Sequence, residues 1–360
     1  MPIVLDAMGG DAAPRDPVRG AVAAAREDGL EVLLVGDLAR IEAELAELDV
    51  EPEVRGRLEL VHAAEVVGMD EPAITPIRKK RNSSLRVCAE LVRAGRSEAM
   101  VSAGNTGATM ISAKMVIGVA PGVDRPALAA TVPNHDGWTI LLDVGANVDT
   151  KAEQLRQFAV MGHLYAREIV GVERPRVGLL SIGEEAGKGN EFTREVFGWL
   201  EESSLHFIGN VEGGDIFEGT ADVVVCDGFV GNIVLKSAEG LATMIQAMLR
   251  EEIVKSPLTR LGGGLIKPAL LRFRQRTAYD EYGGAPLLGL KAGCFIAHGR
   301  SNPKAIHNAL RRASTFVEHR VHERISQKMA ELHITADEGP DRPAPDRQAS
   351  RRRTAGEGAK

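Results

Sequence analysis

Residues 1–27, which read MPIVLDAMGGDAAPRDPVRGAVAAARE, hold one complete strand–turn–helix unit. Residues 3–5 are a short apolar run, residues 6–11 (DAMGGD) form a glycine-containing turn, and residues 16–27 are an alanine-rich amphipathic stretch. An apolar strand that leads directly into a helix is typical of a parallel sheet covered by helices on both faces. This stretch therefore predicts an α/β fold.

The same unit recurs along most of the chain. Further strands are expected at residues 32–35, 100–102, 140–143, 177–182, 207–208 and 223–226, and further helices at 82–93, 153–170 and 191–202. This alternation predicts a three-layer, Rossmann-like, mostly parallel sheet. One catalytic domain is expected over residues 1–334. The stretch 335–360 is rich in proline, glycine and charge, which predicts a disordered tail.

Composition narrows the class of protein. The 360 residues carry 44 Lys and Arg against 50 Asp and Glu, a net charge of −6, which disfavours general nucleic-acid binding. Cys88, Cys226 and Cys294 lack disulfide or zinc spacing and suit a reducing cytosol. The N-terminus does not resemble a signal peptide, and no run approaches the ~18 apolar residues of a membrane span. We therefore expect a soluble cytoplasmic protein.

Five predicted strands end in similar turns that mix glycine with Asp, Asn, Ser or Thr. They are residues 6–11 (DAMGGD), 102–108 (SAGNTGA), 143–147 (DVGAN), 181–191 (SIGEEAGKGNE) and 226–232 (CDGFVGN). Glycine lets an anion approach the backbone closely, and helix N-termini offer unpaired N–H groups. Ligands of open α/β sheets bind beyond the carboxyl ends of the strands. The turns therefore predict an oxyanion site where they converge on one sheet edge.

Known cofactor and nucleophile motifs do not fit these turns. The first turn lacks the spacing of GxGxxG, and Lys188 is followed by glycine, unlike the lysine of a P-loop. The sequence has no GxSxG nucleophile motif and no histidine spacing typical of a metal site. We expect neither cofactor nor metal, and chemistry that depends on positioning and electrostatics.

Eight ordered blocks carry a resemblance to a known family. They read DAMGGDAAP, EPAITPIRKKRNSSL, SAGNTGA, DVGAN, LSIGEEAGKGNE, GNVEGGDI, CDGFVGNIVLKSAEG and YGGAPLLGLK. In this order the chain resembles the bacterial acyl-carrier-protein-dependent phosphate acyltransferases of phospholipid synthesis, from residue 1 to about residue 325.

The resemblance implies a fold like isocitrate and isopropylmalate dehydrogenases, akin to phosphotransacetylases. It implies transfer of a long-chain acyl group from acyl-carrier-protein to inorganic phosphate, which yields acyl phosphate. It also implies a homodimer, peripheral association with the inner membrane, and a glycerol-3-phosphate acyltransferase as downstream partner. Two alternatives remain open: a short-chain phosphotransacetylase that uses acyl-coenzyme A, and a non-catalytic carrier-protein or membrane adaptor.

The polar turn residues are the candidate site. We expect Lys188 to bind phosphate, Asn147 and Asn232 to donate hydrogen bonds, and Asp143 and Asp227 to orient the lysine or to deprotonate the nucleophile. Candidate substrate-binding residues are Asp6, Gly9, Gly10, Asp11, Ser102, Gly104, Asn105, Thr106, Gly107, Gly183 and Gly187. The alternative for each polar residue is a helix cap or turn. For the histidines, including His298, core or surface roles are expected.

Two basic stretches are candidate contacts for the carrier protein or the membrane. The first is the run Arg78, Lys79, Lys80 and Arg81, whose alternative is a solvated helix start. The second, residues 255–277, predicts two short helices with a bend at Gly262–Gly264 and Pro268, and its basic, amphipathic pattern indicates a membrane surface. Its key residues are Leu258, Leu261, Leu265 and Lys267. Its alternative is a helical hairpin packed on a partner subunit.

Overall fold

A computed structural model describes residues 1–277 and 283–337. Within them one eleven-stranded sheet has the order β3-β2-β1-β4-β11-β10-β5-β6-β9-β7-β8. Its strands are β1 Ile3–Asp6, β2 Val32–Gly36, β3 Leu58–His62, β4 Ala99–Ser102, β5 Ala127–Pro133, β6 Trp138–Leu142, β7 Arg176–Leu180, β8 His206–Val211, β9 Val223–Val225, β10 Ala285–Leu288 and β11 Gly293–Ile296. The predicted α/β class and every predicted strand are confirmed, whereas β3, β5, β10 and β11 were not predicted.

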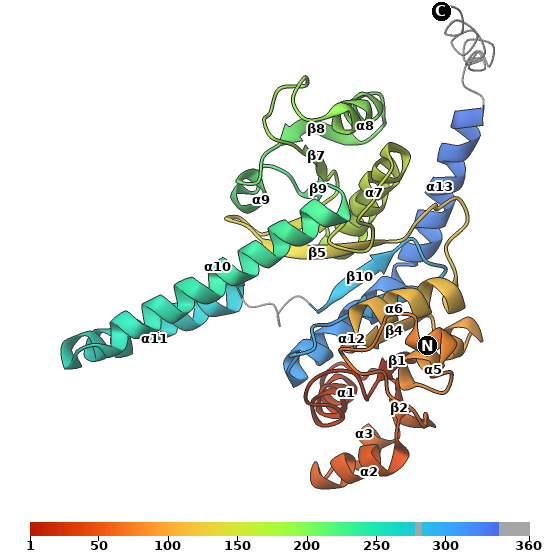
Figure 1. The fold of residues 1–360 in the computed structure, drawn as a ribbon. Helices are drawn as coiled ribbons and strands as arrows, with labels where there is room; N and C mark the ends of the chain where they lie inside the picture. Colours follow the sequence, from red (N-terminus) through yellow and green to blue (C-terminus); the bar gives the residue numbers. More distant parts are fainter. Residues whose placement is uncertain (278–282, 338–360) are drawn as a thin grey trace, which may run out of the picture.

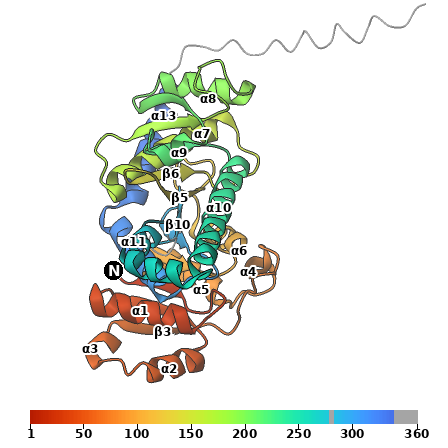
Figure 2. The same cartoon turned by 90° about the vertical axis from the view of Figure 1, so that its left-hand side faces the viewer.

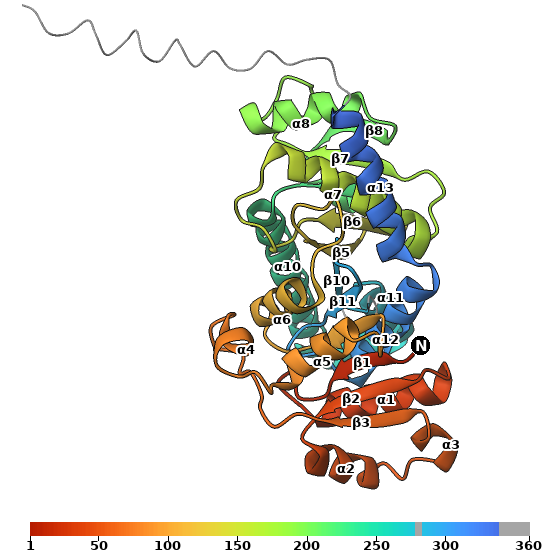
Figure 3. The same ribbon diagram turned by 90° about the vertical axis from the view of Figure 1, so that its right-hand side faces the viewer.

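Helices cover both faces of the sheet (Figure 3). They are α1 Arg15–Glu27, α2 Leu38–Glu47, α3 Pro52–Arg55, α4 Thr75–Arg78, α5 Ser84–Arg93, α6 Thr106–Ser112, α7 Ala152–Tyr165, α8 Glu191–Glu201, α9 Asp215–Glu218, α10 Gly228–Val254, α11 Pro257–Thr277, α12 Pro303–Glu318 and α13 Val321–Asp337, with π-helical turns η1 Ala113–Ile117 and η2 Ala166–Val170. Helices α1, α7, α12 and α13 pack on one face, and α5, α6 and α9 pack on the other. The three-layer architecture is therefore confirmed.

The sheet reverses direction near its middle. Strands β3, β2, β1, β4 and β11 are mutually parallel, and so are β6, β9, β7 and β8. Between the two sets, β10 is antiparallel to β11 and β5, and β5 is antiparallel to β6. We call the first set with its helices the first half and the second set the second half. Figure 1 shows the first half below the second.

This reversal corrects the expectation that all five turns lie at one sheet edge. Within the sheet, the strands of the second half run opposite to β1 and β4, so their carboxyl ends lie at the other edge. Adjacent strands are rotated by roughly 20–25°, and this twist accumulates across the sheet. Over the six steps from β1 to β9 an average twist adds up to roughly 120–150°, which offsets much of the reversal in strand direction.

Helices α10 and α11 form a hairpin that projects from the second half (Figures 1 and 2). The expected pair of short helices within 255–277 is wrong, because α11 is one helix with Pro268 inside it. The chain turns at Ser256 instead, whose Oγ accepts a hydrogen bond from the Thr259 N–H at 3.1 Å. A Cβ at Gly263 would lie 2.5 Å from Ile253 Cγ2, so this glycine allows close helix packing.

The C-terminal boundary differs slightly from the expected one. Helix α13 continues to Asp337, beyond the expected start of the tail at residue 335. The rest of the predicted tail, residues 338–360, lies outside the described residues. Across the part of the chain that is described, no helix has the length and apolar character needed to cross a bilayer.

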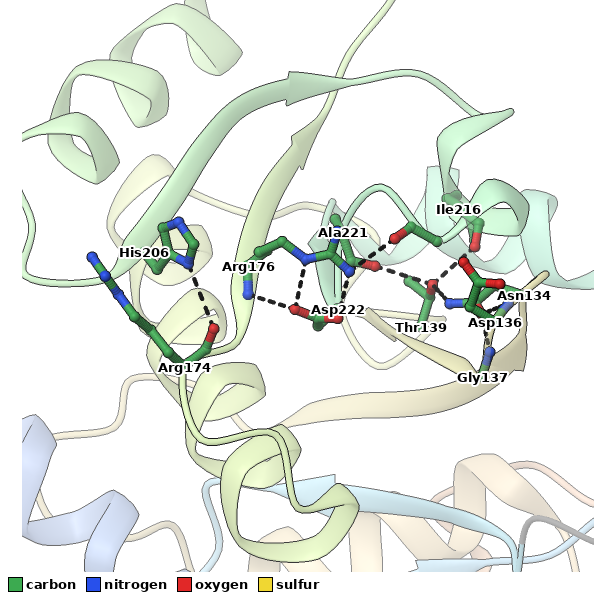
Figure 4. Close-up of polar contacts among 11 residues, drawn as sticks. Asn134, Asp136, Gly137, Thr139, Arg174, Arg176, His206, Ile216, Ala221 and Asp222 are labelled. Carbon is green, nitrogen blue, oxygen red and sulfur yellow. Dashed lines mark hydrogen bonds and ion pairs between the residues drawn. The ribbon is translucent and has the colours of Figure 1, made fainter.

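A polar cluster joins the amino ends of β7 and β9 (Figure 4). Arg176 donates to the Asp222 carboxylate from Nε at 3.0 Å and from Nη2 at 2.8 Å, and also to the Gly219 oxygen at 2.9 Å. Nearby, Thr139 Oγ1 donates to the Ile216 oxygen at 2.9 Å. These groups are paired with each other, and they lie at the strand ends opposite to the glycine turns. We therefore assign this cluster a structural role.

Candidate active site

The turns after β1 and β4 are held together by a buried carboxylate. Asp6 Oδ2 accepts a hydrogen bond from Ser102 Oγ at 2.8 Å, and Oδ1 accepts from the Met8 N–H at 3.1 Å. Ser102 Oγ in turn accepts from the Gly104 N–H at 3.1 Å. Burial raises the pKa of Asp6, and hydrogen bonds from Ser84 and Ser102 oppose the rise. Asp6 and Ser102 therefore position the turns.

Glycine is required where these two turns meet. A Cβ at Gly9 would lie 2.7 Å from the Gly104 nitrogen, closer than any side-chain carbon can approach. Gly10 has a φ of 108°, which favours glycine. The backbones of the two turns therefore lie in direct contact.

Asn105 is engaged in local structure. Its Oδ1 caps α6 by accepting from the Ala108 N–H at 3.0 Å, and its Nδ2 donates to the oxygens of Met69 at 2.8 Å and Glu71 at 2.9 Å. The next residue, Thr106, is exposed. Asn105 thus fixes the loop before α4, whereas Thr106 remains accessible.

The turn after β6 is built around Asp143, which is fully buried. Its carboxylate accepts from the N–H groups of Leu128 at 2.9 Å, Ala146 at 3.1 Å and Asn147 at 2.7 Å, and from Asn147 Nδ2 at 2.9 Å. Asn147 Nδ2 also donates to the Pro126 oxygen at 2.9 Å. Burial raises the pKa of Asp143, and these hydrogen bonds oppose the rise. Asp143 and Asn147 shape the turn without exposing their polar atoms.

Helix α10 begins in contact with the β6 turn. A Cβ at Gly228 would lie 2.5 Å from the Asn147 oxygen, and one at Gly231 would lie 1.9 Å from the Asp143 oxygen. Only glycine permits this approach. The turns after β6 and β9 therefore form one unit.

The polar residues of the β9 turn differ in exposure. Asp227 caps α10, and its Oδ1 accepts from the N–H groups of Phe229 at 3.0 Å and Val230 at 2.9 Å. Asn232 is exposed and lies beside Gly145 of the β6 turn. Among these residues Asn232 is therefore accessible to a substrate.

Lys188 lies in the turn after β7, at the same sheet edge as the β6 and β9 turns. Its side chain is half-exposed, and its Nζ is 4.0 Å from Glu185 Oε2, a long ion pair. Gly183 packs against the aliphatic part of Lys188, and Gly187 is exposed. The ammonium is therefore only loosely held.

A sixth turn, which sequence reasoning missed, follows β11. The Ala297 N–H donates to the Ser102 oxygen at 2.9 Å, and the Asp11 N–H donates to the Gly299 oxygen at 2.8 Å. These bonds place His298 beside the turns after β1 and β4. The signal was present as another apolar strand, glycine turn and helix in CFIAHGRSNPKAI, residues 294–306.

The pKa of His298 is affected by burial and by several charged side chains. Burial lowers the pKa of His298, and the charges of Lys236 and Arg300 lower it further, whereas Glu239 and Asp11 act in the opposite direction. Lys236 and Glu239 belong to α10, which follows the β9 turn.

The four basic residues 78–81, at the end of α4 and just after it, differ in their contacts. Lys80 Nζ binds the Glu71 carboxylate and donates to the Val66 oxygen at 2.7 Å, so it supports the loop. Arg78, Lys79 and Arg81 are exposed.

The candidate membrane-contact residues of the hairpin are exposed. Leu258, Leu261 and Leu265 are 79%, 67% and 78% exposed, and Lys267 is exposed as well.

A separate cavity of about 590 Å³ lies between α7 and α13. Two of its lining cations are paired with carboxylates, Arg324 with Glu168 and Lys328 with Glu331. None of the six glycine turns contributes to its lining. We therefore place the candidate site at the turns.

The architecture belongs to a known class of α/β proteins. A phosphotransacetylase from Streptococcus pyogenes superposes with a TM-score of 0.57 at 17% identity, covering 88% of this chain and 94% of that one. At such low identity the likeness establishes the fold alone. It confirms the expected phosphotransacetylase-like architecture.

Sequence comparison establishes the family. A family model described as "Fatty acid synthesis protein" matches residues 1–324. Proteins called phosphate acyltransferase are 50% identical in Geobacter sulfurreducens, over 93% of this chain and 96% of the relative, and in Aquifex aeolicus, over 88% and 93%. The chain belongs to the phosphate acyltransferase family.

Proposed function

We propose that the protein is an acyltransferase that moves a long-chain fatty acyl group from acyl-carrier-protein to inorganic phosphate, giving acyl phosphate for phospholipid synthesis. The observation that carries this proposal is the close packing of paired glycine turns, those after β1 and β4 in the first half and those after β6 and β9 in the second, in a chain of this family. Amide-rich turns and nearby cations suit a phosphate and a developing oxyanion.

The reaction does not require a covalent acyl-enzyme intermediate. A phosphate oxygen attacks the thioester carbonyl, the C–S bond breaks, and the proton of hydrogen phosphate ends on the released thiol. Alignment of two reactants lowers the activation barrier by ~7–11 kcal/mol, and one oxyanion donor lowers it by about 3–4 kcal/mol. Positioning two substrates beside fixed donors is therefore a sufficient mechanism.

The candidate residues divide into two roles in this proposal. Lys188 and Asn232 are accessible, and we assign them to phosphate and to the thioester oxygen. Asp143 and Asn147 are positioning residues, because their polar atoms are buried and hydrogen-bonded. Asp227 positions α10 as its cap. The substrate-binding assignments at the β1 and β4 turns rest on backbone amides and on Thr106.

Substrate choice tests the function directly. The protein is incubated with phosphate and either palmitoyl-carrier protein or acetyl-coenzyme A, and acyl phosphate is measured by mass spectrometry. We expect palmitoyl phosphate and release of the carrier thiol. Acyl phosphate from acetyl-coenzyme A alone would support the short-chain alternative, and no product from either donor would support the adaptor.

The proposal assigns peripheral membrane association to the α10–α11 hairpin. Exposed leucines beside arginines and lysines are typical of a membrane-surface helix. Leu265→Glu should abolish sedimentation with anionic liposomes and preserve activity in detergent. Phe217→Glu, which alters an exposed apolar residue on α9, is the matched control and should sediment normally. Equal sedimentation of both variants would contradict the anchor.

Partner contacts complete the proposal. Arg78, Lys79 and Arg81 are assigned to the acidic carrier protein, since exposed complementary charge speeds encounter. The homodimer and transfer of product to a glycerol-3-phosphate acyltransferase rest on the family resemblance. Light scattering measures the oligomeric state, and a monomeric mass at working concentration would contradict the dimer.

A further inference from the structure

We propose that Asn210 is a positioning residue of the candidate active site, because its side chain holds the turn that carries Lys188. This inference rests on the proposed function, in which Lys188 binds phosphate. Asn210 lies near the end of β8, outside the five turns that the sequence singled out. It therefore acts on phosphate binding through the lysine, without a contact of its own to phosphate.

Asn210 and the backbone of Lys188 bond to the same carbonyl. Asn210 Nδ2 donates a hydrogen bond to the Glu185 oxygen at 2.9 Å. The same oxygen accepts from the Lys188 N–H at 2.9 Å, and this bond closes the turn over residues 185–188. Asn210 thus fixes the peptide group on which the backbone position of Lys188 depends.

The side chain of Lys188 has little other support. Its Nζ lies 4.0 Å from Glu185 Oε2, and an ion pair between two exposed side chains contributes little. Its aliphatic part passes over Gly183, where a Cβ would lie 3.0 Å from Lys188 Cγ. The position of the ammonium therefore depends on the backbone of the turn, which Asn210 holds.

An irregularity in β8 directs Asn210 toward this turn. The register of β8 against β7 shifts by one residue, and Gly209 has a φ of 101°. Ile208 and Val211 are three residues apart, yet both pack in the same apolar cluster, whereas regular alternation would place them on opposite faces. Such a bulge re-aims the next side chains. Asn210 lies on the other face, which is covered by α8, the helix that follows the Lys188 turn.

The burial of Asn210 indicates a role beyond packing. The residue is 6% exposed, and its Oδ1 is buried without a hydrogen-bond partner among the described residues. A buried amide that uses only part of its hydrogen-bonding capacity costs stability that an apolar side chain would not. The contact that distinguishes Asn210 from an apolar side chain is the Nδ2 bond to the turn.

Steady-state kinetics of Asn210→Leu and Asn210→Ala tests the inference. Leucine has a similar size but no donor, so it should keep or raise the melting temperature. We expect both variants to raise the KM for phosphate about three- to tenfold, as loss of one hydrogen bond does. The KM for palmitoyl-carrier protein should stay within about twofold. A protein that only becomes less stable would not show this combination.

A double variant tests whether the effect passes through Lys188. Lys188→Ala should raise the KM for phosphate, and adding Asn210→Ala should raise it no further, because the side chain that Asn210 positions is already absent. If the effect of Asn210→Ala is as large without the lysine as with it, the inference is overturned.

Asn134→Ala is the matched control. Asn134 lies in the turn between β5 and β6, at the opposite edge of the sheet from Lys188, and its Nδ2 donates to Thr139 Oγ1 at 3.0 Å. This variant should keep the KM for phosphate even if it melts earlier. Folded Asn210→Leu and Asn210→Ala with a KM for phosphate within about twofold of the unaltered protein would overturn the inference.

Calorimetric titration with phosphate separates this inference from the proposed function, because binding requires no turnover. Weaker phosphate binding by Asn210→Leu, together with no acyl phosphate from the unaltered protein, would support the inference and refute the acyltransfer reaction. Equal phosphate affinity of Asn210→Leu and the unaltered protein would overturn the inference, even if the unaltered protein forms palmitoyl phosphate.

Discussion

Replacing Gly231 with alanine tests whether the contact between α10 and the β6 turn sets the geometry of the site. The added Cβ would lie 1.9 Å from the Asp143 oxygen and 2.8 Å from Cys226 Sγ. Ordinary carbon contacts need about 3.5 Å, so α10 must move by more than about 1 Å. The obstructing atom is a backbone oxygen inside a hydrogen-bonded turn, so it cannot rotate away.

The movement has two measurable consequences. Overpacking of this kind costs about 1–3 kcal/mol of stability. A shift of about 1 Å in a positioned group lowers activity ~10²-fold. Because Asn232 lies on the same helix, we expect Gly231→Ala to reduce kcat/KM for phosphate ~10²-fold while the protein remains folded.

Gly240→Ala provides the control on the same helix. A Cβ at Gly240 meets nothing within 4 Å, so alanine should keep full activity and add about 0.5–1 kcal/mol of stability. Both variants are assayed for palmitoyl phosphate formation and for urea unfolding. Full activity in Gly231→Ala would refute the reasoning that this contact positions the catalytic face of α10.

Further predictions concern titration and stability. Burial raises the pKa of Cys294 to about 12 and those of Cys88 and Cys226 well above their usual value, so Ellman's reagent at pH 8 should titrate none of the three thiols until urea is added. Burial acts to raise the pKa of Asp222, but hydrogen bonds from Arg176 outweigh this effect, so the pKa is lowered in the folded protein. The ion pair therefore stabilises the folded state above pH 3.8, and this stabilisation is lost as the pH falls through the folded-state pKa. Arg176→Gln should therefore lower the free energy of unfolding by about 1 kcal/mol at pH 7, a small value because Arg176 is partly exposed. The loss should be clearly smaller at pH 3. Urea titrations measure both values, and an equal loss at the two pH values would contradict the ion pair.

The local units of the fold were readable from sequence because each combines an apolar strand, a glycine turn and an amphipathic helix. The antiparallel strands β5 and β10 and the short β11 were not, since four-residue runs such as 285–288 carry little periodicity. The reversal of the sheet depends on pairing between residues far apart, such as Leu288 with Ala127. No local pattern encodes that pairing.

The candidate site was predictable at the level of turns and less so at the level of roles. Asp143 and Asn232 both belong to similar glycine-containing motifs that follow strands, yet the first is fully buried and the second is exposed. Burial depends on how β6, β9 and α10 pack together, which one turn does not reveal. His298 was missed because β11 was missed, so its glycine turn had no strand to place it.

The most direct test of this account is a crystal structure of the protein with bound phosphate, at a concentration near its KM. We expect the phosphate within hydrogen-bond distance of Lys188 Nζ or Asn232 Nδ2, with backbone N–H groups of the glycine turns around it. Phosphate bound only at a distant surface, with Lys188, Asn232 and the glycine turns making no contact to it, would contradict a reaction site at the turns.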